Sequence, residues 1–305
     1  MTPSVSVDAH VSTLLDAQDN PDAQEPFPVA AAVDYARAVM ALARESLPSA
    51  IRVTADQAYG PDRLQKFDVY APIQTQGAPV LVFWHGGGWT HGYRQWVRFM
   101  ARHATQLGIV LVAPSYRLAP THPLPETVDD ALNLLALLRS RADEWGGNPD
   151  RLLLSGHSAG GHLAAMVAVL RQERRERGIP DAAILGCLPI SGILDLQASD
   201  PLPGSLEERV YTHVLRGRDA EDDVVFSPLY RSSSNTIPFD LTVGQMDSAR
   251  VRRSNKRMQK LLEAQGSPVA LHELADRDHF QTHLDLRAPS HPWYARLHAL
   301  AHAPV

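Results

Sequence analysis

The pentapeptide Gly156–Gly160, with the sequence Gly-His-Ser-Ala-Gly, is the first feature of this chain that could do chemistry. It follows the apolar run 152–155 and precedes a helix-like segment, so that strand, tight turn and helix succeed one another. Glycines on both sides allow a sharp turn, which would hold the Ser158 hydroxyl exposed above a sheet. We therefore predict that Ser158 is a nucleophile. The alternative is a glycine-rich loop with no chemical role.

A serine hydroxyl needs a base to take its proton, and the base needs a carboxylate that holds its tautomer. On a turn of this kind the acid and then the histidine follow the serine along the chain, each after a strand. Asp247 follows the apolar run 239–243, where its alternative role is to cap the next helix. His279 follows the run 269–274 and is the expected base. His283, expected on an exposed helix, could form half of a metal site with His279, but no further ligands complete one, so we expect no metal.

The segment His85–Trp89, with the sequence His-Gly-Gly-Gly-Trp, directly follows the apolar run 80–84. Without side chains in the way, its backbone N–H groups can point at a substrate. With the N–H of Ala159 they would form an oxyanion hole, in which each donor contributes about 3 kcal/mol to the transition state. Phosphate binding is the competing interpretation, but neither glycine-rich nucleotide pattern is present. Aromatic side chains that follow the loop could line a substrate pocket, although some of them would only pack: Trp89, His91, Tyr93 and Trp96.

Short apolar runs alternate with helix-like segments from residue 79 onward. This alternation indicates the α/β class, with a mostly parallel sheet that helices cover on both faces. Two alternating runs upstream fit two further strands joined by a turn. The expected strands are 51–54, 66–70, 80–84, 109–113, 152–155, 184–190, 239–243 and 269–274, and the expected helices lie near 94–107, 126–143, 159–175 and 250–265.

Two parts of the chain do not follow this rhythm. Residues 1–50 carry two helix-like stretches separated by a proline-rich connection. The interval 195–235 is rich in proline, glycine and serine, and we interpret it as an insertion that acts with 1–50 as a helical cap over the site. The alternative is a merely long connection, and in either case the catalytic domain would span 51–305. The helices expected in these parts are 11–15, 29–47 and 205–215.

Composition limits the partners of this chain of 305 residues. Its net charge of −5 and the absence of a basic stripe argue against a nucleic-acid partner. The single cysteine, Cys187, cannot form an internal disulfide and is expected to be buried. No run approaches the ~20 apolar residues of a membrane span, and the N-terminus lacks the basic-then-apolar layout of a secretion signal. We therefore expect a cytoplasmic protein.

Four motifs together resemble those of the hormone-sensitive-lipase-like esterases of the α/β-hydrolase superfamily. The resemblance covers residues 65–285 and implies an α/β-hydrolase fold, with a mostly parallel eight-stranded sheet flanked by helices. It further implies an oxyanion hole made by the N–H groups of Gly87, Gly88 and Ala159, an acyl-enzyme on Ser158, and no cofactor. The motifs are His85–Trp89, Ser115–Pro120, Asn148–Arg151 and Gly156–Gly161.

The chain also resembles the arylformamidases (kynurenine formamidases). The arylformamidases often carry a bulky residue in place of Gly88, and the esterases often have a proline near the acid that is missing around Asp247. The expected substrate is therefore a small-molecule carboxylic ester or aryl formamide, cleaved by a serine hydrolase of the EC 3.1.1 or 3.5.1 class. The segments that carry this resemblance are 15–20, 243–248, 271–274 and 278–280.

Two other functions stay open on the sequence. The same triad could pass the acyl group to an alcohol or an amine instead of water. A binding protein could also have kept the hydrolase fold, because a fold does not imply a function, although such proteins usually lack a member of the triad. The choice between ester and formamide, the length of the acyl group and the formation of a homodimer are equally open.

Overall fold

The computed structural model describes residues 24, 27–216, 219 and 221–303. The helix expected over 11–15 and the arylformamidase-like segment 15–20 lie outside these described residues. No helix within the described ranges combines the length and the apolar character that crossing a membrane requires.

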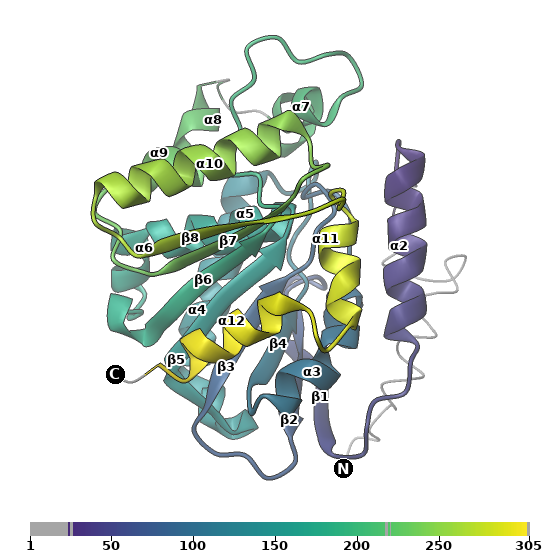
Figure 1. Ribbon diagram of the computed structural model, residues 1–305, viewed down its shortest axis with the longest axis vertical. Helices are drawn as coiled ribbons and strands as arrows, with labels where there is room; N and C mark the ends of the chain where they lie inside the picture. Colours follow the sequence, from purple (N-terminus) through teal and green to yellow (C-terminus); the bar gives the residue numbers. More distant parts are fainter. Residues whose placement is uncertain (1–23, 25–26, 217–218, 220, 304–305) are drawn as a thin grey trace.

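An eight-stranded sheet runs through the described part of the chain in the order β1-β2-β4-β3-β5-β6-β7-β8 (Figure 1). The pairs β1–β2 and β2–β4 are antiparallel, and every pair from β4 to β8 is parallel. The expectation of a mostly parallel eight-stranded sheet is confirmed. The strands are β1 (Ile51–Ala58), β2 (Lys66–Pro72), β3 (Ala78–Trp84), β4 (Val110–Pro114), β5 (Gly147–His157), β6 (Ile184–Ile190), β7 (Phe239–Gly244) and β8 (Val269–Leu274).

The strand boundaries agree with the sequence at β6 and β8 and differ most at β5. The strands β6 and β8 have the expected bounds, whereas β5 begins at Gly147, five residues before the expected start at Leu152. The early part of β5 reads Gly-Asn-Pro-Asp-Arg, a polar stretch that carries no strand signal of its own. Pairing with β3, in which Ala78 lies opposite Gly147, extends the strand there.

Helices cover both faces of the sheet (Figure 1). The expected helix 159–175 is interrupted at Leu170, whose ψ of 64° is not helical. The segment 94–107 begins as a tight 3₁₀ helix before it becomes α-helical. The α-helices are α2 (Ala30–Ala43), α3 (Ala101–Gln106), α4 (Leu124–Arg141), α5 (Ala159–Val169), α6 (Arg171–Glu176), α7 (Leu206–Arg209), α8 (Asp222–Val225), α9 (Pro228–Arg231), α10 (Ala249–Ala264), α11 (Gln281–Leu284) and α12 (Pro292–Ala301). The 3₁₀ helices are Arg94–Met100, Ala142–Trp145, Asp181–Ala183 and Asp285–Arg287, and Val210–Val214 forms a π-helical turn.

Alternate side chains of each central strand enter two different hydrophobic clusters. In β3, Val80, Val82 and Trp84 belong to the cluster under α4, α5 and α10, while Leu81 and Phe83 belong to the cluster under α2, α3 and α12. This alternation follows from the two-residue repeat of a strand, and burial on both faces explains why the sequence of β3 is apolar throughout. The sheet is therefore a rigid platform between two layers of helices.

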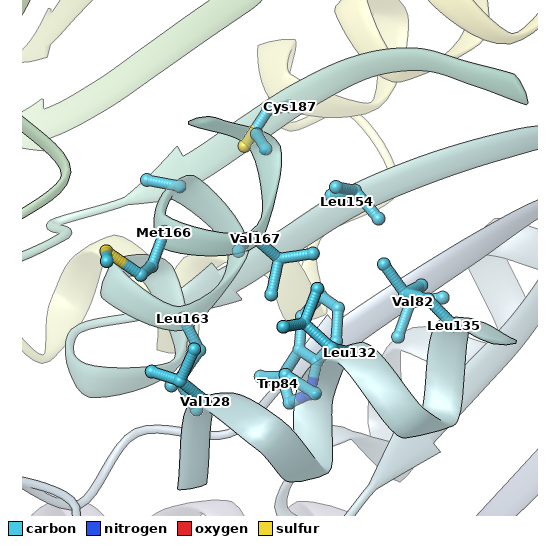
Figure 2. Packing of buried hydrophobic residues seen from close by; sticks show 14 of the residues in the cluster. Val82, Trp84, Val128, Leu132, Leu135, Leu154, Leu163, Met166, Val167 and Cys187 are labelled. Atoms are coloured by element: carbon cyan, nitrogen blue, oxygen red, sulfur yellow. The ribbon is translucent and has the colours of Figure 1, made fainter. Parts of the chain in front are cut away.

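The first of these clusters is shown from close by in Figure 2. Leu132 of α4 and Val167 of α5 pack near Val82 and Trp84 of β3, and Cys187 of β6 lies in the same cluster (Figure 2). The predicted burial of Cys187 is confirmed, since the residue is 0% exposed. Truncation of Leu132 to alanine would cost about 2–5 kcal/mol, because the cavity cannot close fully in so dense a core.

Candidate active site

Ser158 occupies the sharp turn between β5 and α5. Its φ of 56° and ψ of −116° are rarely adopted by a residue that has a Cβ atom, so the turn holds it in a strained conformation. The backbone N–H of Ser158 donates to Ile190 O at 2.9 Å, and its carbonyl accepts from the N–H of His162 at 2.9 Å. A Cβ on Gly160 would lie 2.0 Å from Trp84 O, so only glycine fits there. These contacts fix the serine at the carboxyl end of the sheet.

His279 and Asp247 reach Ser158 from two neighbouring strands. His279 Nε2 lies 2.8 Å from Ser158 Oγ, and His279 Nδ1 lies 2.6 Å from Asp247 Oδ1. Asp247 follows β7 and His279 follows β8, and the carboxyl ends of these parallel strands meet at one edge of the sheet. The structure therefore brings the three predicted side chains into one series of hydrogen bonds, from hydroxyl to imidazole to carboxylate.

The alternative role of Asp247 as a helix cap does not apply. Ser248 caps α10 instead, because its hydroxyl accepts a hydrogen bond from the N–H of Val251. Asp247 Oδ2 accepts from Ser191 Oγ at 2.6 Å and from the N–H of Gly244 at 2.9 Å, so both of its oxygens have partners.

These partners set the charge of the carboxylate. Burial raises the pKa of Asp247. This effect is outweighed by the hydrogen bond and charge of His279 and by the hydrogen bonds from Ser191 and Gly244, so that the pKa of the carboxyl lies below its usual value. Asp247 is therefore ionised at neutral pH and can stabilise a protonated imidazole.

Ser191 was missed in the sequence analysis. It directly follows β6, and it links Asp247 to Thr282, whose hydroxyl lies 2.9 Å from Ser191 Oγ and donates to His279 O at 2.8 Å. A polar residue at the carboxyl end of a central strand was a signal that could have identified it. Ser191 and Thr282 thus hold the acid and the imidazole loop together from behind.

The glycine loop after β3 lies beside the serine. Trp84 pairs with Gly156 in the register of β3 and β5, so that the loop and the turn begin at the same level of the sheet. Gly87 has a φ of 122°, and a Cβ on it would lie 2.0 Å from His91 O. Gly87 and Gly88 line the same cavity as Ser158. Ala159 is the first residue of α5, where a backbone N–H has no acceptor within the helix.

A buried chain of hydrogen bonds supports His279 from below. His157 Nε2 lies 2.7 Å from His279 O, and because a carbonyl only accepts, this nitrogen carries the proton. His157 Nδ1 then accepts from Tyr35 Oη at 3.3 Å, and Tyr35 Oη accepts from His283 Nδ1 at 2.9 Å. The expectation that His283 is exposed is wrong, since it is 0% exposed and stacks on Phe83.

All three members of this chain are neutral. Burial, with the nearby charges of His279 and His283, lowers the pKa of His157 well below its usual value. Burial lowers the pKa of His283 to about 3 and raises the pKa of Tyr35. Because Tyr35 belongs to α2, the chain connects the N-terminal helix to the loop of the imidazole.

The cavity over Ser158 has a volume of about 160 Å³. The predicted aromatic wall of Trp89, Tyr93 and Trp96 is wrong for this cavity, because none of these side chains lines it. Trp89 and Trp96 are 0% and 2% exposed and pack inside the two hydrophobic clusters, and Tyr93 is half-buried beside Trp96. Of the aromatic side chains expected after the glycine loop, only His91 lines the cavity, and the others that line it include Phe27, Tyr35 and Phe280. Phe27, Tyr35 and Phe280 come from segments distant in sequence from the glycine loop, whereas the aromatic wall was expected directly after that loop.

No set of three or more histidine, cysteine, aspartate or glutamate side chains suited to a metal ion occurs among the described residues. The site around Ser158 itself consists of side chains and glycine backbone at the wall of a cavity. It presents a hydroxyl next to a base, a buried anion behind the base, and glycine N–H groups at the same cavity.

The model of a family described as having the alpha/beta hydrolase fold matches residues 81–282. The chain is 29% identical to a probable carboxylic ester hydrolase, LipM of Mycobacterium tuberculosis, over 67% of this chain and 50% of LipM. It is 29% identical to the kynurenine formamidase of Danio rerio, over 77% of this chain and 78% of that protein. The chain thus spans half the length of LipM.

Solved structures agree on the architecture. The crystal structure of esterase B from Lactobacillus rhamnosis superimposes with a TM-score of 0.72 at 20% sequence identity, and the match covers 94% of this chain and 91% of that one. At this level of identity the likeness concerns the fold.

Proposed function

Because this chain belongs to the α/β-hydrolase fold family, whose model matches residues 81–282, we propose that it is a serine hydrolase of small-molecule carboxylic esters or aryl formamides. The observation that carries the proposal is the hydrogen-bonded series from Ser158 Oγ through His279 to Asp247 at the wall of a cavity. Relatives named as a carboxylic ester hydrolase and as a kynurenine formamidase support the choice of both substrate classes.

In the proposed mechanism Ser158 is the nucleophile and His279 the general base. His279 Nε2 takes the proton of the hydroxyl while Ser158 Oγ attacks the carbonyl carbon, and Asp247 stabilises the imidazolium that forms. The C–O or C–N bond then breaks, and the leaving group takes the proton from His279. Water, deprotonated by His279, attacks the acyl-enzyme and releases the carboxylic acid together with free Ser158.

The oxyanion of the tetrahedral intermediates would lie against backbone N–H groups. We assign the donors to Gly87, Gly88 and Ala159, since two of them line the cavity and the third begins a helix next to the nucleophile. One donor of this kind stabilises the transition state by about 3–4 kcal/mol, because it is already oriented before charge develops.

We also propose that the N-terminal segment 1–50 and the insertion 195–235 form a helical cap over the catalytic domain 51–305. In support, Phe27 and Tyr35 from the first part and Leu206 from the second line the cavity over Ser158. Short helices fill the insertion, α7, α8 and α9 among them. A cytoplasmic location and a homodimer stay predictions, which cell fractionation and light scattering of the purified chain would test.

The test compares Ser158→Ala with the matched variant Ser140→Ala, whose serine is exposed on α4 and lines neither cavity. Short para-nitrophenyl esters and N-formylkynurenine are assayed side by side, and an organophosphate serves as a covalent probe. We expect Ser158→Ala to lose about 10³-fold or more in turnover and all labelling, while Ser140→Ala keeps both.

Turnover in Ser158→Ala close to that of the unmodified chain would refute the assignment of the nucleophile. Analysis of the products with an added alcohol distinguishes hydrolysis from acyl transfer, because only transfer yields a new ester. Absence of both turnover and labelling in the unmodified chain would favour a binding protein instead.

A further inference from the structure

A second, larger cavity adjoins the cavity over Ser158. Its volume is about 540 Å³, which lies within the range of small-molecule sites. Four residues line both cavities, so the two share a wall: Pro28, Thr90, His91 and Arg209. The larger cavity therefore lies directly beside the cavity in which a substrate carbonyl would meet Ser158.

The two cavities differ in character. Apolar side chains such as Phe27, Leu206 and Phe280 surround most of the smaller one, whose 160 Å³ is about the size of an apolar cavity that binds one benzene ring. The larger cavity has two arginines, Arg63 and Arg209, and a single carboxylate in its wall. We conclude that the smaller cavity suits a short acyl or aryl group and that the larger one suits a polar, anionic group.

The carboxylate in the wall of the larger cavity is already engaged on the protein. Asp62 Oδ1 accepts a hydrogen bond from the N–H of Leu64 at 2.8 Å, and Asp62 Oδ2 lies 3.8 Å from His122 Nε2. Within the part of the chain that the structure describes, Asp62 forms these contacts and no ion pair with Arg209.

Arg209 is the arginine that lines both cavities, and it forms no ion pair with any residue that the structure describes. The acidic residues beside it in the chain have other partners, since Glu207 lies 3.5 Å from Arg250 and Glu208 accepts from the N–H of Gly204 at 2.6 Å. Arg209 is half-buried at the end of α7. A half-buried guanidinium without a counter-ion favours an anion from solution, because its planar N–H donors match a carboxylate in a bidentate manner.

We propose that Arg209 determines specificity by binding a carboxylate of the substrate. This inference rests on the proposed function and narrows it to short esters or formamides that carry a carboxylate on the part that enters the larger cavity. Arg63, the other arginine in this wall, already has a partner on the protein. Among the described residues of the wall, the one unpaired guanidinium, that of Arg209, matches one planar, singly charged group, whereas a doubly charged phosphate would need a second free cation. The carboxylate takes no part in bond breaking and serves to hold the carbonyl at Ser158.

The experiment uses two substrates that differ only in this group. They are the acetate esters of para-hydroxyphenylpropanoate and of para-hydroxyphenylpropanamide, which have the same reacting bond and nearly the same size. The ratio of their kcat/KM values is measured for the unmodified chain, for Arg209→Met and for Arg209→Lys. The matched control is Arg253→Met, because Arg253 is an exposed arginine of α10 that lines neither cavity.

We expect the unmodified chain to prefer the carboxylate at least about tenfold, mainly through KM, as a bidentate charged hydrogen bond would provide. Arg209→Met should bring the ratio close to one, and Arg209→Lys should retain part of the preference, since lysine keeps the charge but not the planar fork. Arg253→Met should keep the original ratio. A ratio near one in the unmodified chain, or an unchanged ratio in Arg209→Met, would overturn the proposal.

Two further measurements cover the case in which Arg209→Met does not fold and the case in which the esters are not cleaved. If Arg209→Met does not fold, as judged by its thermal unfolding, the ratios of the unmodified chain and of Arg209→Lys decide. Calorimetric binding of para-hydroxyphenylpropanoate to Ser158→Ala, with and without Arg209→Met, tests the carboxylate site without catalysis.

The two proposals fail in different ways. If the neutral ester is cleaved by a Ser158-dependent reaction but no carboxylate preference exists, only the role of Arg209 is wrong. If neither ester is cleaved but the acid binds through Arg209, the proposed hydrolase activity fails and the anion site stands.

Discussion

Acidification should destabilise this protein steeply, because its core holds several histidines in the neutral form. His85, His162 and His283 are 0% exposed, and His157 is 1% exposed. Burial lowers the pKa of His85 and His162 to about 4 and that of His283 to about 3. The pKa of His157 is lowered well below its usual value for the same reason.

The direction and size of the effect follow from proton binding. In the unfolded chain these rings have a pKa near 6.5, so from about pH 6.5 down to about pH 4 the unfolded state binds more protons than the folded state. Their contribution to stability is complete above about pH 6.5 and is lost as the pH falls toward the folded pKa. At about pH 5, His85, His162 and His283 each lose about 2 kcal/mol, or about 6 kcal/mol together. This is a large part of the about 5–15 kcal/mol that stabilises a typical domain.

The assay is urea unfolding followed by circular dichroism between about pH 7.5 and pH 5, within which the free energy of unfolding should fall steeply. The matched variant is His162→Gln, because the glutamine amide can still donate to Phe226 O, which lies 2.7 Å from His162 Nε2. Removal of one titrating ring should lower the slope of unfolding free energy against pH by about 1.4 kcal/mol per unit. Asp247 affects stability in a different pH range. Its pKa is lowered from 3.8, so its contribution to the free energy of unfolding is lost only as the pH falls below that value.

A free energy of unfolding that stays constant over this pH range would refute the reasoning, because it would mean that the buried rings take up protons in the folded state. An unchanged slope in His162→Gln would refute it for that ring alone.

Three further substitutions test the site. Asp247→Asn should lower kcat about 10⁴-fold in an ester assay without unfolding the chain, because the amide holds the wrong imidazole tautomer; a loss below tenfold would contradict its assigned role. Tyr35→Phe should lower the free energy of urea unfolding by about 1–3 kcal/mol, because it leaves His157 Nδ1 and His283 Nδ1 without their buried partner. An unchanged midpoint of the urea unfolding curve would argue against this chain of hydrogen bonds. Gly87→Ala should abolish ester turnover and lower the midpoint temperature of thermal unfolding, because the added Cβ would lie 2.0 Å from His91 O. Full activity of this variant would show that the glycine loop is free to move.

The strands and the three catalytic candidates could be predicted because each leaves a local signal. Apolar runs mark the strands, and Ser158, Asp247 and His279 each lie within five residues after the end of one of them. Since carboxyl ends of parallel strands meet at one edge of a sheet, order along the chain was enough to predict that these residues lie together. The wrong predictions concern side-chain direction, as with Trp89, whose φ of 60° gave no sequence signal and whose ring is buried beside His162.

The sequence by itself determined the parallel sheet, the strained turn at Ser158 and the order of acid and base, because backbone pattern and chain order carry that information. Only the tertiary structure decided which side chains surround the reacting atoms. Tyr35 joins His157 and His283 across 122 and 248 residues, and Arg209 reaches the cavity over Ser158 from the long segment between β6 and β7. Such contacts arise when segments distant in sequence pack together, and neither residue type nor periodicity within one segment specifies which distant partner it will contact.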